Sequence, residues 1–202
     1  MNEAISFLLM LPLFVMAVVV HEVSHGVVAL RFGDTTALTA GRLTLNPLRH
    51  IDLFGTILLP LMLALFHAPL FGWAKPVPVN AMRLRHPKRD IFWVGAAGPA
   101  ANFSFAVVVS LLMRVVPLPD IGVVIGTSLI LINLVLGIFN LLPIPPLDGS
   151  RILAGVLPAR FLPFLMRMER WGFLILFALL YLGVIDRILW PLVAWCAKAL
   201  GV

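Results

Sequence analysis

The sequence predicts an all-α polytopic membrane protein, and three observations lead to this fold class. Of the 202 residues, 61% are hydrophobic and only 12% are charged, whereas soluble domains are usually about half apolar and a quarter charged. Several stretches approach the ~20 apolar residues that are needed to cross a bilayer. No stretch is long and polar enough to fold separately in water. We therefore expect one integral membrane domain over residues 1–202.

The first apolar segment, about residues 4–32, is predicted to be a retained membrane helix. It starts MNEAIS, without the basic region of a secretory signal peptide, and its apolar run is longer than a signal-peptide core. The next stretch, TTALTAGRLTL at residues 35–45, is rich in threonine and partly alternates between polar and apolar residues. This pattern predicts a small β element at the membrane edge.

The apolar stretch at about residues 53–71 is predicted to re-enter the membrane without crossing it. It contains Pro60 and Pro69, and basic residues flank it on both sides. Cytoplasmic loops are the ones enriched in lysine and arginine, so both flanks are placed on the cytoplasmic side. The flanking basic residues are Arg31, Arg42, Arg49, Lys75, Arg83, Arg85, Lys88 and Arg89.

Two further membrane helices are predicted at about residues 91–116 and 121–142, joined by a turn that carries no lysine or arginine. With residues 4–32 they form the expected three-helix catalytic core, in which the first and last helices run toward the cytoplasm. The proline-rich stretch PIPP ends the third of these helices. Two apolar stretches, 171–185 and 188–202, predict C-terminal helices split at Asp186-Arg187, as a hairpin in preference to one interrupted helix.

The motif HEVSH places three ionisable groups inside the first apolar segment. His21 and His25 are four residues apart, so a helix presents both on one face, where they can share a zinc ion. Glu22 follows His21 directly and can reach a water on that metal. An ionisable residue near the bilayer centre costs several kcal/mol. This cost favours a metal site over ordinary packing.

A catalytic zinc usually has three protein ligands, so the motif requires one more. Most other acidic and histidine residues lie at segment ends or in polar loops. Asp148 is the leading candidate, because it follows a proline-broken helix end and stands beside Gly149. His67 is the second candidate. The alternative for Asp148 is that it N-caps the helix that begins at Gly149.

Together, HEVSH and NLLPIPPLDGSR (residues 140–151) resemble the intramembrane site-2 protease family of zinc metalloproteases. The stretch GAAGPAANF (residues 95–103) is similar to the family's third, glycine-containing motif. NPLRHIDLFGT and GWAKPVPVN are similar to its small bacterial and archaeal branch, which lacks PDZ and CBS domains. The resemblance covers roughly residues 15 to 155 and is specific because the motifs occur together.

The resemblance implies a role for each matching residue. His21, His25 and Asp148 would bind one Zn²⁺ ion per chain, Glu22 would be the general base, and Asn140 would hold the substrate or the developing oxyanion. For Asn140 the alternative is an ordinary interhelical hydrogen bond, worth about 1 kcal/mol. The small residues Gly95 and Gly98, with Asn102, are interpreted as a close-packing surface.

The predicted function is hydrolysis of peptide bonds within transmembrane segments of membrane proteins. The expected partners are such a segment and the lipid bilayer, with no nucleic acid, and the oligomeric state is left open. The expected location is the plasma membrane of a prokaryote, with the active site opening toward the cytoplasm. A membrane metal transporter with the same His and Asp site is the alternative, although transport would not require Glu22. An inactive scaffold ranks last, because all four catalytic residues are present.

Overall fold

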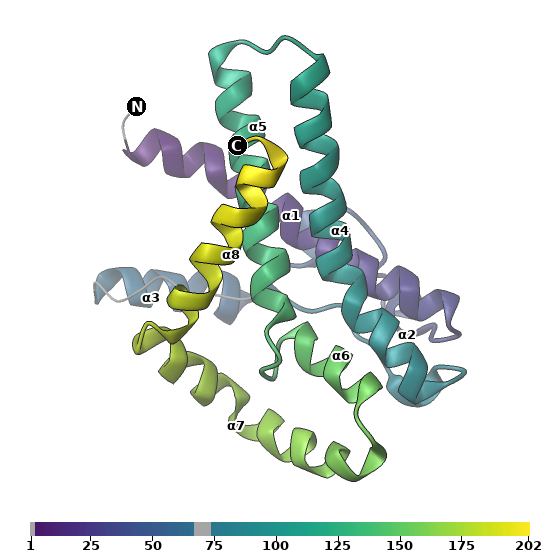
Figure 1. Ribbon diagram of the computed structural model, residues 1–202. Helices are drawn as coiled ribbons and strands as arrows, with labels where there is room; N and C mark the ends of the chain where they lie inside the picture. The colour runs from purple at the N-terminus through teal and green to yellow at the C-terminus, as the bar shows by residue number, and fades with distance from the viewer. Residues whose placement is uncertain (1–2, 67–73) are drawn as a thin grey trace.

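The computed structural model describes residues 3–66 and 74–202, and within these ranges it contains helices and turns but no strand. Three long helices pack against one another: α1 (Glu3–Arg31), α4 (Pro87–Val115) and α5 (Asp120–Leu141) (Figure 1). Residues Met10–Arg31 of α1, together with α4 and α5, are long and apolar enough to cross a membrane. Three helices that could span a membrane are therefore confirmed at the predicted positions.

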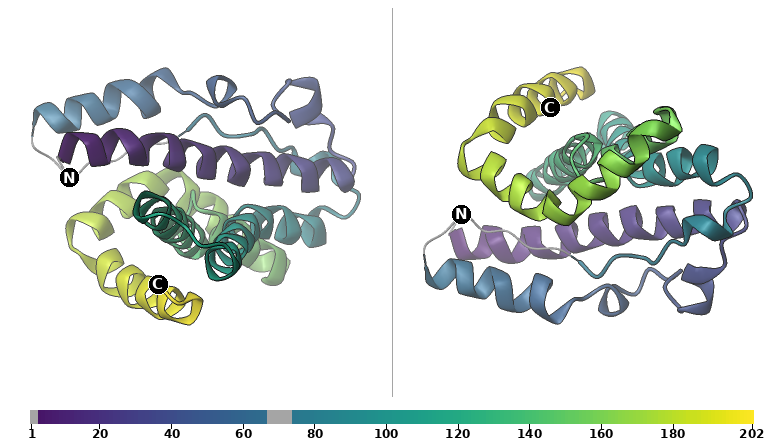
Figure 2. Two further views of the ribbon diagram at one scale, coloured as in Figure 1. Left: turned by 90° about the horizontal axis from the view of Figure 1, so that it is seen from above. Right: turned by 90° about the horizontal axis from the view of Figure 1, so that it is seen from below.

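Shorter elements complete the part of the chain that the structure describes. These are α2 (Thr36–Thr39), α3 (Leu59–Leu65), α6 (Asp148–Val156), α7 (Leu162–Tyr181) and α8 (Val184–Leu200), with 3-10 turns at Pro47–Arg49, Ala81–Arg83 and Ala159–Phe161 and a π-helical turn at Leu53–Leu58. Both views in Figure 2 show the same layering. The described segments between α1 and α4 lie on one side of α1, and helices α4 to α8 lie on the other.

Helices α4 and α5 run side by side, and a short loop joins them at one end of the molecule (Figure 1). The buried face of α4 repeats every four residues and carries mostly small side chains: Gly98, Asn102, Ala106 and Ser110. Such a stripe lets helix backbones approach closely, which matters in lipid because apolar side chains gain little from leaving the bilayer. The buried state of Gly95 and Gly98 confirms the predicted close-packing surface.

The predicted β element at residues 35–45 is wrong. The structure forms the single-turn helix α2 there, followed by a turn in which Gly41 has a positive φ of 63°. The carboxylate of Asp34 accepts hydrogen bonds from the backbone N–H and the hydroxyl of Thr36, and the Thr39 hydroxyl donates to the carbonyl of Thr35. Threonine and aspartate side chains that bond the local backbone favour turns, and here they outweigh the strand preference of threonine.

The segment predicted to re-enter the membrane begins as a capped helix. The Asp52 side chain accepts a hydrogen bond of 2.7 Å from the backbone N–H of Gly55, and the π-helical turn continues into α3. Residues 67–73 lie outside the described ranges, and so does the alternative metal ligand His67. Re-entry therefore stays a prediction.

The C-terminal part forms two helices, but the break is not at Asp186-Arg187 as expected. It falls at Gly183, whose φ of 66° is left-handed and ends the preceding helix. Asp186 instead lies in the first turn of α8, where a negative charge suits the helix dipole. Helices α7 and α8 meet at a bend of 75°, so they do not form an antiparallel hairpin. Leu189 and Val193 of α8 pack with α5 in the largest buried apolar cluster.

Candidate metal centre

Three side chains converge where α1 meets the start of α6. His21 and His25 lie one turn apart on α1, and Asp148 is the first residue of α6. Their exposed fractions are 6%, 2% and 5%. The Nε2 atoms of His21 and His25 lie 3.0 and 3.1 Å from Oδ2 of Asp148, and 3.1 Å from each other. The structure thus brings together the three ligands predicted from the sequence.

Asp148 reaches this position because α6 packs tightly against the end of α5. A Cβ atom at Gly149 would overlap the carbonyl oxygens of Leu141 and Leu142, so only glycine permits this approach. The residue before α6 is Leu147, and no side chain caps the helix. The alternative that Asp148 is an N-cap is therefore wrong. Its other oxygen, Oδ1, lies 3.3 Å from the Arg151 guanidinium.

Helix α4 makes room for the cluster through two of its glycines. A Cβ atom at Gly98 would overlap the imidazole rings of both His21 and His25. A Cβ atom at Gly95 would lie 2.9 Å from Cβ of Arg151, and therefore too close to α6. The motif GAAGPAANF thus allows both α1 and α6 to approach α4.

Hydrogen bonds at the far side of each ring determine how the imidazoles are protonated. Nδ1 of His21 lies 2.6 Å from Oδ1 of Asn102, and Nδ1 of His25 lies 2.6 Å from the backbone carbonyl of Val94. Both partners are acceptors, so each Nδ1 must carry the hydrogen. In the neutral imidazole each Nε2 then presents a lone pair.

This arrangement fits a bound zinc ion. With neutral histidines, two nitrogen lone pairs and a carboxylate oxygen face one another at 3.0–3.1 Å, and Oδ2 of Asp148 is buried without a hydrogen-bond donor. Three such acceptors repel one another unless a cation lies between them. Two ligands of a tetrahedral zinc, each about 2.0–2.2 Å from the metal, lie about 3.3–3.6 Å apart. Only a small adjustment separates the observed triangle from that spacing.

Glu22 lies beside the cluster and contacts an extended segment from the other layer. We name residues 74–80 the Pro-Val-Pro strap. The backbone N–H of Val77 donates a hydrogen bond of 2.8 Å to Oε2 of Glu22, and the Val77 side chain is buried. Pro76 and Pro78 have no N–H, so Val77 supplies the donor at the centre of the strap. The carboxylate is thereby held against the strap, one residue along α1 from His21.

Asn140 is not placed in the cluster. Its Nδ2 donates to the carbonyl of Leu136, four residues earlier on α5, at 3.0 Å. This bond lies within one helix, so it is not the interhelical bond considered as the alternative. The role of Asn140 in holding substrate stays a prediction.

Sequence reasoning missed Asn133, which is buried in α5 and bonded to Asn102. A signal for it was present, because Asn133 stands alone among apolar residues in the stretch LILINLVL. Lone polar residues inside a membrane helix usually face protein and have a partner. The contact of Val77 with Glu22 has no comparable local signal.

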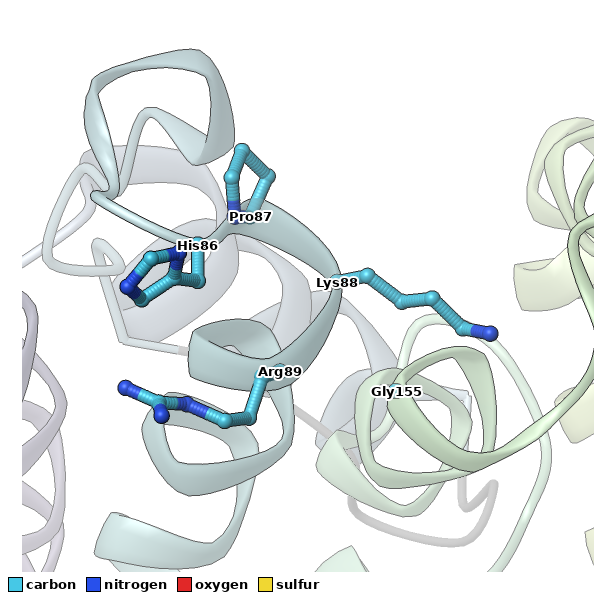
Figure 3. Close-up of a pocket in the computed structure, with 5 residues that line it drawn as sticks. All are labelled: His86, Pro87, Lys88, Arg89 and Gly155. Atoms are coloured by element: carbon cyan, nitrogen blue, oxygen red, sulfur yellow. The ribbon is translucent and has the colours of Figure 1, made fainter.

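The open pocket shown in Figure 3 is a separate feature. It is lined by His86, Pro87, Lys88, Arg89 and Gly155, where the start of α4 meets α6. Its ionisable side chains are basic and it contains no carboxylate. Among its described lining residues there is therefore no carboxylate that could join a metal site.

Comparisons with known proteins agree with the geometry. Residues 118–183 match the family model described as peptidase family M50. YwhC of Bacillus subtilis is 36% identical over 196 residues, which cover 91% of this chain and 86% of that relative. Rip2 of Mycolicibacterium smegmatis is 34% identical over 97% of this chain and 75% of its own length. Zinc metalloprotease MJ0392 of Methanocaldococcus jannaschii is 27% identical over 80% of this chain and 38% of its own length. The names of all three describe zinc metalloproteases. No solved structure matches the chain.

Proposed function

This chain belongs to peptidase family M50 and is a zinc metalloprotease, and we propose that it cleaves peptide bonds inside transmembrane segments of other membrane proteins. The observation that carries this proposal is the buried His-His-Asp cluster, whose two histidines lie on a helix apolar enough to span a bilayer. A protease with its metal centre at that depth meets substrates that are themselves in the membrane.

We assign His21, His25 and Asp148 as the ligands of one zinc ion. A zinc ion in a site of this kind activates water and polarises the carbonyl group of the bond to be cleaved. The chain's part is to hold three ligand atoms in place with their lone pairs free. The Nδ1–H bonds to Asn102 and Val94 do this for the two imidazoles.

Glu22 is the proposed general base. It is next to His21 on α1, and the Val77 N–H fixes one of its carboxylate oxygens. The carboxylate would take a proton from the attacking water and then deliver it to the leaving amine. Asn140, near the end of α5, is proposed to hold the substrate or the developing oxyanion.

The substrate must present an extended backbone at this site, because the amides of a helix are already hydrogen-bonded. We therefore propose that a substrate helix unwinds locally before cleavage, beside the Pro-Val-Pro strap and Glu22. The metal centre is proposed to open toward the cytoplasm, and the protein to lie in the plasma membrane of a prokaryote. The basic residues that flank residues 53–71 support this orientation.

The experiment that tests the proposal compares the wild-type protein with Glu22→Gln, both purified in detergent. Zinc content is measured in each, and cleavage is assayed on a panel of transmembrane peptides. We expect about one zinc per chain in both proteins, with cleavage by the wild type and a loss of at least about 100-fold in the variant, since it lacks the proton acceptor. Cleavage only outside the transmembrane segments would contradict intramembrane proteolysis, and full activity of Glu22→Gln would contradict the assigned base.

The metal transporter considered from the sequence is not favoured, because the relatives are named zinc metalloproteases. The same variant separates the two functions. A transporter would keep its metal flux in Glu22→Gln, whereas a protease loses hydrolysis.

A further inference from the structure

Two buried asparagines connect α5 to the metal centre through α4. Asn102 on α4 is 0% exposed and Asn133 on α5 is 1% exposed. Nδ2 of Asn102 donates to Oδ1 of Asn133 at 2.8 Å, while Oδ1 of Asn102 faces Nδ1 of His21 at 2.6 Å. This series of hydrogen bonds therefore connects three helices and ends on a proposed zinc ligand.

The donors and acceptors in this series of hydrogen bonds allow only one orientation of the two amide side chains. Nδ2 of Asn133 donates to the carbonyl of Leu129 at 2.8 Å, so its oxygen is the atom that faces Asn102. An oxygen there requires the amide nitrogen of Asn102 opposite, and this nitrogen also lies 3.5 Å from the carbonyl of Ala17. The oxygen of Asn102 is thus turned toward His21, where it accepts the Nδ1 hydrogen.

We propose that Asn133 is a positioning residue for the metal centre, and that it acts on His21 through Asn102. By fixing the amide of Asn102, Asn133 keeps the hydrogen of His21 on Nδ1 and the Nε2 lone pair directed at Asp148. This inference rests on the proposed ligand role of His21, His25 and Asp148. Groups that hold metal ligands in this way typically change metal affinity by about 10- to 100-fold when they are replaced.

A purely structural role for the pair is the competing explanation, because asparagines also hold membrane helices together by hydrogen bonds. The two explanations differ in what Asn133→Leu does to zinc affinity while the helices stay packed. They also differ in how the two asparagines combine. If Asn133 acts only through Asn102, replacing Asn133 should have no further effect on zinc affinity once Asn102 has been replaced.

The experiment measures zinc affinity of the detergent-purified full chain by competition with a chelator. Asn102→Leu and Asn133→Leu should each weaken zinc binding by about 10- to 100-fold. The double variant should bind no more weakly than Asn102→Leu alone.

Ser128→Leu is the matched control. Ser128 lies on the same helix as Asn133 and makes the same kind of bond, to the carbonyl four residues earlier. It has no bond to a proposed zinc ligand among the residues described, so its replacement should leave zinc affinity unchanged. Helix content and thermal unfolding of the zinc-free proteins report whether each variant is folded.

The absorption spectrum of the cobalt-loaded protein provides a second readout. Asn133→Leu should shift the cobalt bands of the site, and Ser128→Leu should not. Wild-type zinc affinity and an unchanged cobalt spectrum in folded Asn133→Leu would overturn the inference, as would additive losses in the double variant. Should Asn133→Leu not fold, the same two measurements on Asn133→Ala decide. This smaller variant also removes the oxygen that faces Asn102, so weaker zinc binding is expected and wild-type affinity would overturn the inference. A wild-type protein that binds no zinc would instead contradict the proposed ligands themselves.

Discussion

Gly98 is required both for the packing of α4 against α1 and for the geometry of the metal centre. It is the point where α4 contacts the rings of His21 and His25, and a Cβ atom there would overlap both. The glycine is therefore needed for space between side chains, since its backbone lies within a regular helix. The same residue that lets two membrane helices approach also leaves room for two zinc ligands.

Replacing Gly98 by alanine should weaken zinc binding while leaving the fold in place. The methyl group displaces the imidazoles from the triangle with Asp148, and we expect zinc affinity to fall by about 10- to 100-fold. Zinc titration of the purified variant measures this. Gly122→Ala is the control, because its added methyl group would meet mainly Leu118 and Pro119 side-chain atoms at 3.1 and 3.3 Å. Equal zinc affinity in the two variants would show that the site does not need this space.

The hydrogen bond from Val77 to Glu22 can be removed without changing any side chain of the cluster. Val77→Pro deletes the N–H, and the extended strap between Pro76 and Pro78 suits a third proline. Hydrogen bonds to charged groups contribute about 1.5–3 kcal/mol, so we expect kcat/KM to fall by about tenfold or more. Zinc content should not change.

Val77→Ala separates the backbone donor from the side chain. It keeps the N–H and loses only apolar contacts, such as the approach of Val77 to Gly26. We expect its activity to lie closer to the wild type than that of Val77→Pro. Unchanged or raised activity in Val77→Pro would show that the strap does not orient the carboxylate for catalysis.

The ligand residues could be predicted from the sequence because their chemistry is local. Two histidines at a spacing of four share a helix face, and Asp148 is the acid that follows a proline-broken helix end. The partners of these ligands could not be predicted in the same way. Whether Asn102 meets His21 and Asn133 depends on how three helices are rotated against one another, which no single helix encodes.

At the scale of elements, the short connection after α1 shows how one side chain overrides a sequence pattern. Asp34 binds Thr36 in the following helix and also accepts a hydrogen bond of 2.6 Å from the backbone N–H of Asn80, at the end of the strap. The threonine-rich alternation of residues 35–45 predicted strands, because this pattern does not include the hydrogen bonds that the preceding Asp34 carboxylate makes. The long helices were predictable because runs of apolar residues determine them without distant partners.

The pKa of Asp34 gives this connection a dependence on pH. Burial raises the pKa of the carboxyl, but the Thr36 hydroxyl, the Asn80 and Thr36 amides and the nearby Arg83 outweigh it and hold the pKa below its usual value. A lowered folded-state pKa stabilises the protein above the unfolded pKa of about 3.9, and this contribution is lost as the pH falls through the folded-state value.

The stability difference between the wild type and Asp34→Asn should therefore shrink as the pH is lowered from 7 to about 3. Thermal unfolding in detergent measures this difference at each pH. Proteolysis of the strap at neutral pH should also be faster in Asp34→Asn, because the charged acceptor for Asn80 is gone. A stability difference that is constant across this range would show that the carboxylate charge is not what joins α2 to the strap.

At the scale of the whole molecule, the basic residues lie mostly at one end of the three long helices, and Arg114 is an exception that the structure explains. Arg114 lies in the last turn of α4, at the opposite end from Lys88 and Arg89. Its guanidinium and the Ser110 hydroxyl both donate to the carbonyl of Leu200, at 3.1 and 2.7 Å. Arg114 donates a hydrogen bond to a carbonyl group at the C-terminal end of α8, and this role accounts for its position. It therefore does not count against the orientation given by the other basic residues.

The orientation determines from which side substrate and water reach the zinc. His25 lies six residues before Arg31 and His21 lies ten before it, which corresponds to about 9 and 15 Å along α1 at ~1.5 Å per residue. If Arg31 is cytoplasmic, the metal centre lies in the cytoplasmic half of the bilayer. Labelling of single cysteines tests this directly, in a Cys196→Ser background in which no native thiol remains.

Met82→Cys and Leu118→Cys are suitable positions, because both side chains are exposed and they lie at opposite ends of α4. A membrane-impermeant maleimide should label Leu118→Cys in intact cells, and should label Met82→Cys only after the membrane is permeabilised. Labelling after permeabilisation also serves as the control that each thiol is accessible. The reverse pattern would place the basic loops outside and the opening of the metal centre away from the cytoplasm. The zinc ligands could then stand as assigned, but the substrate would have to be cleaved in the outer half of the membrane.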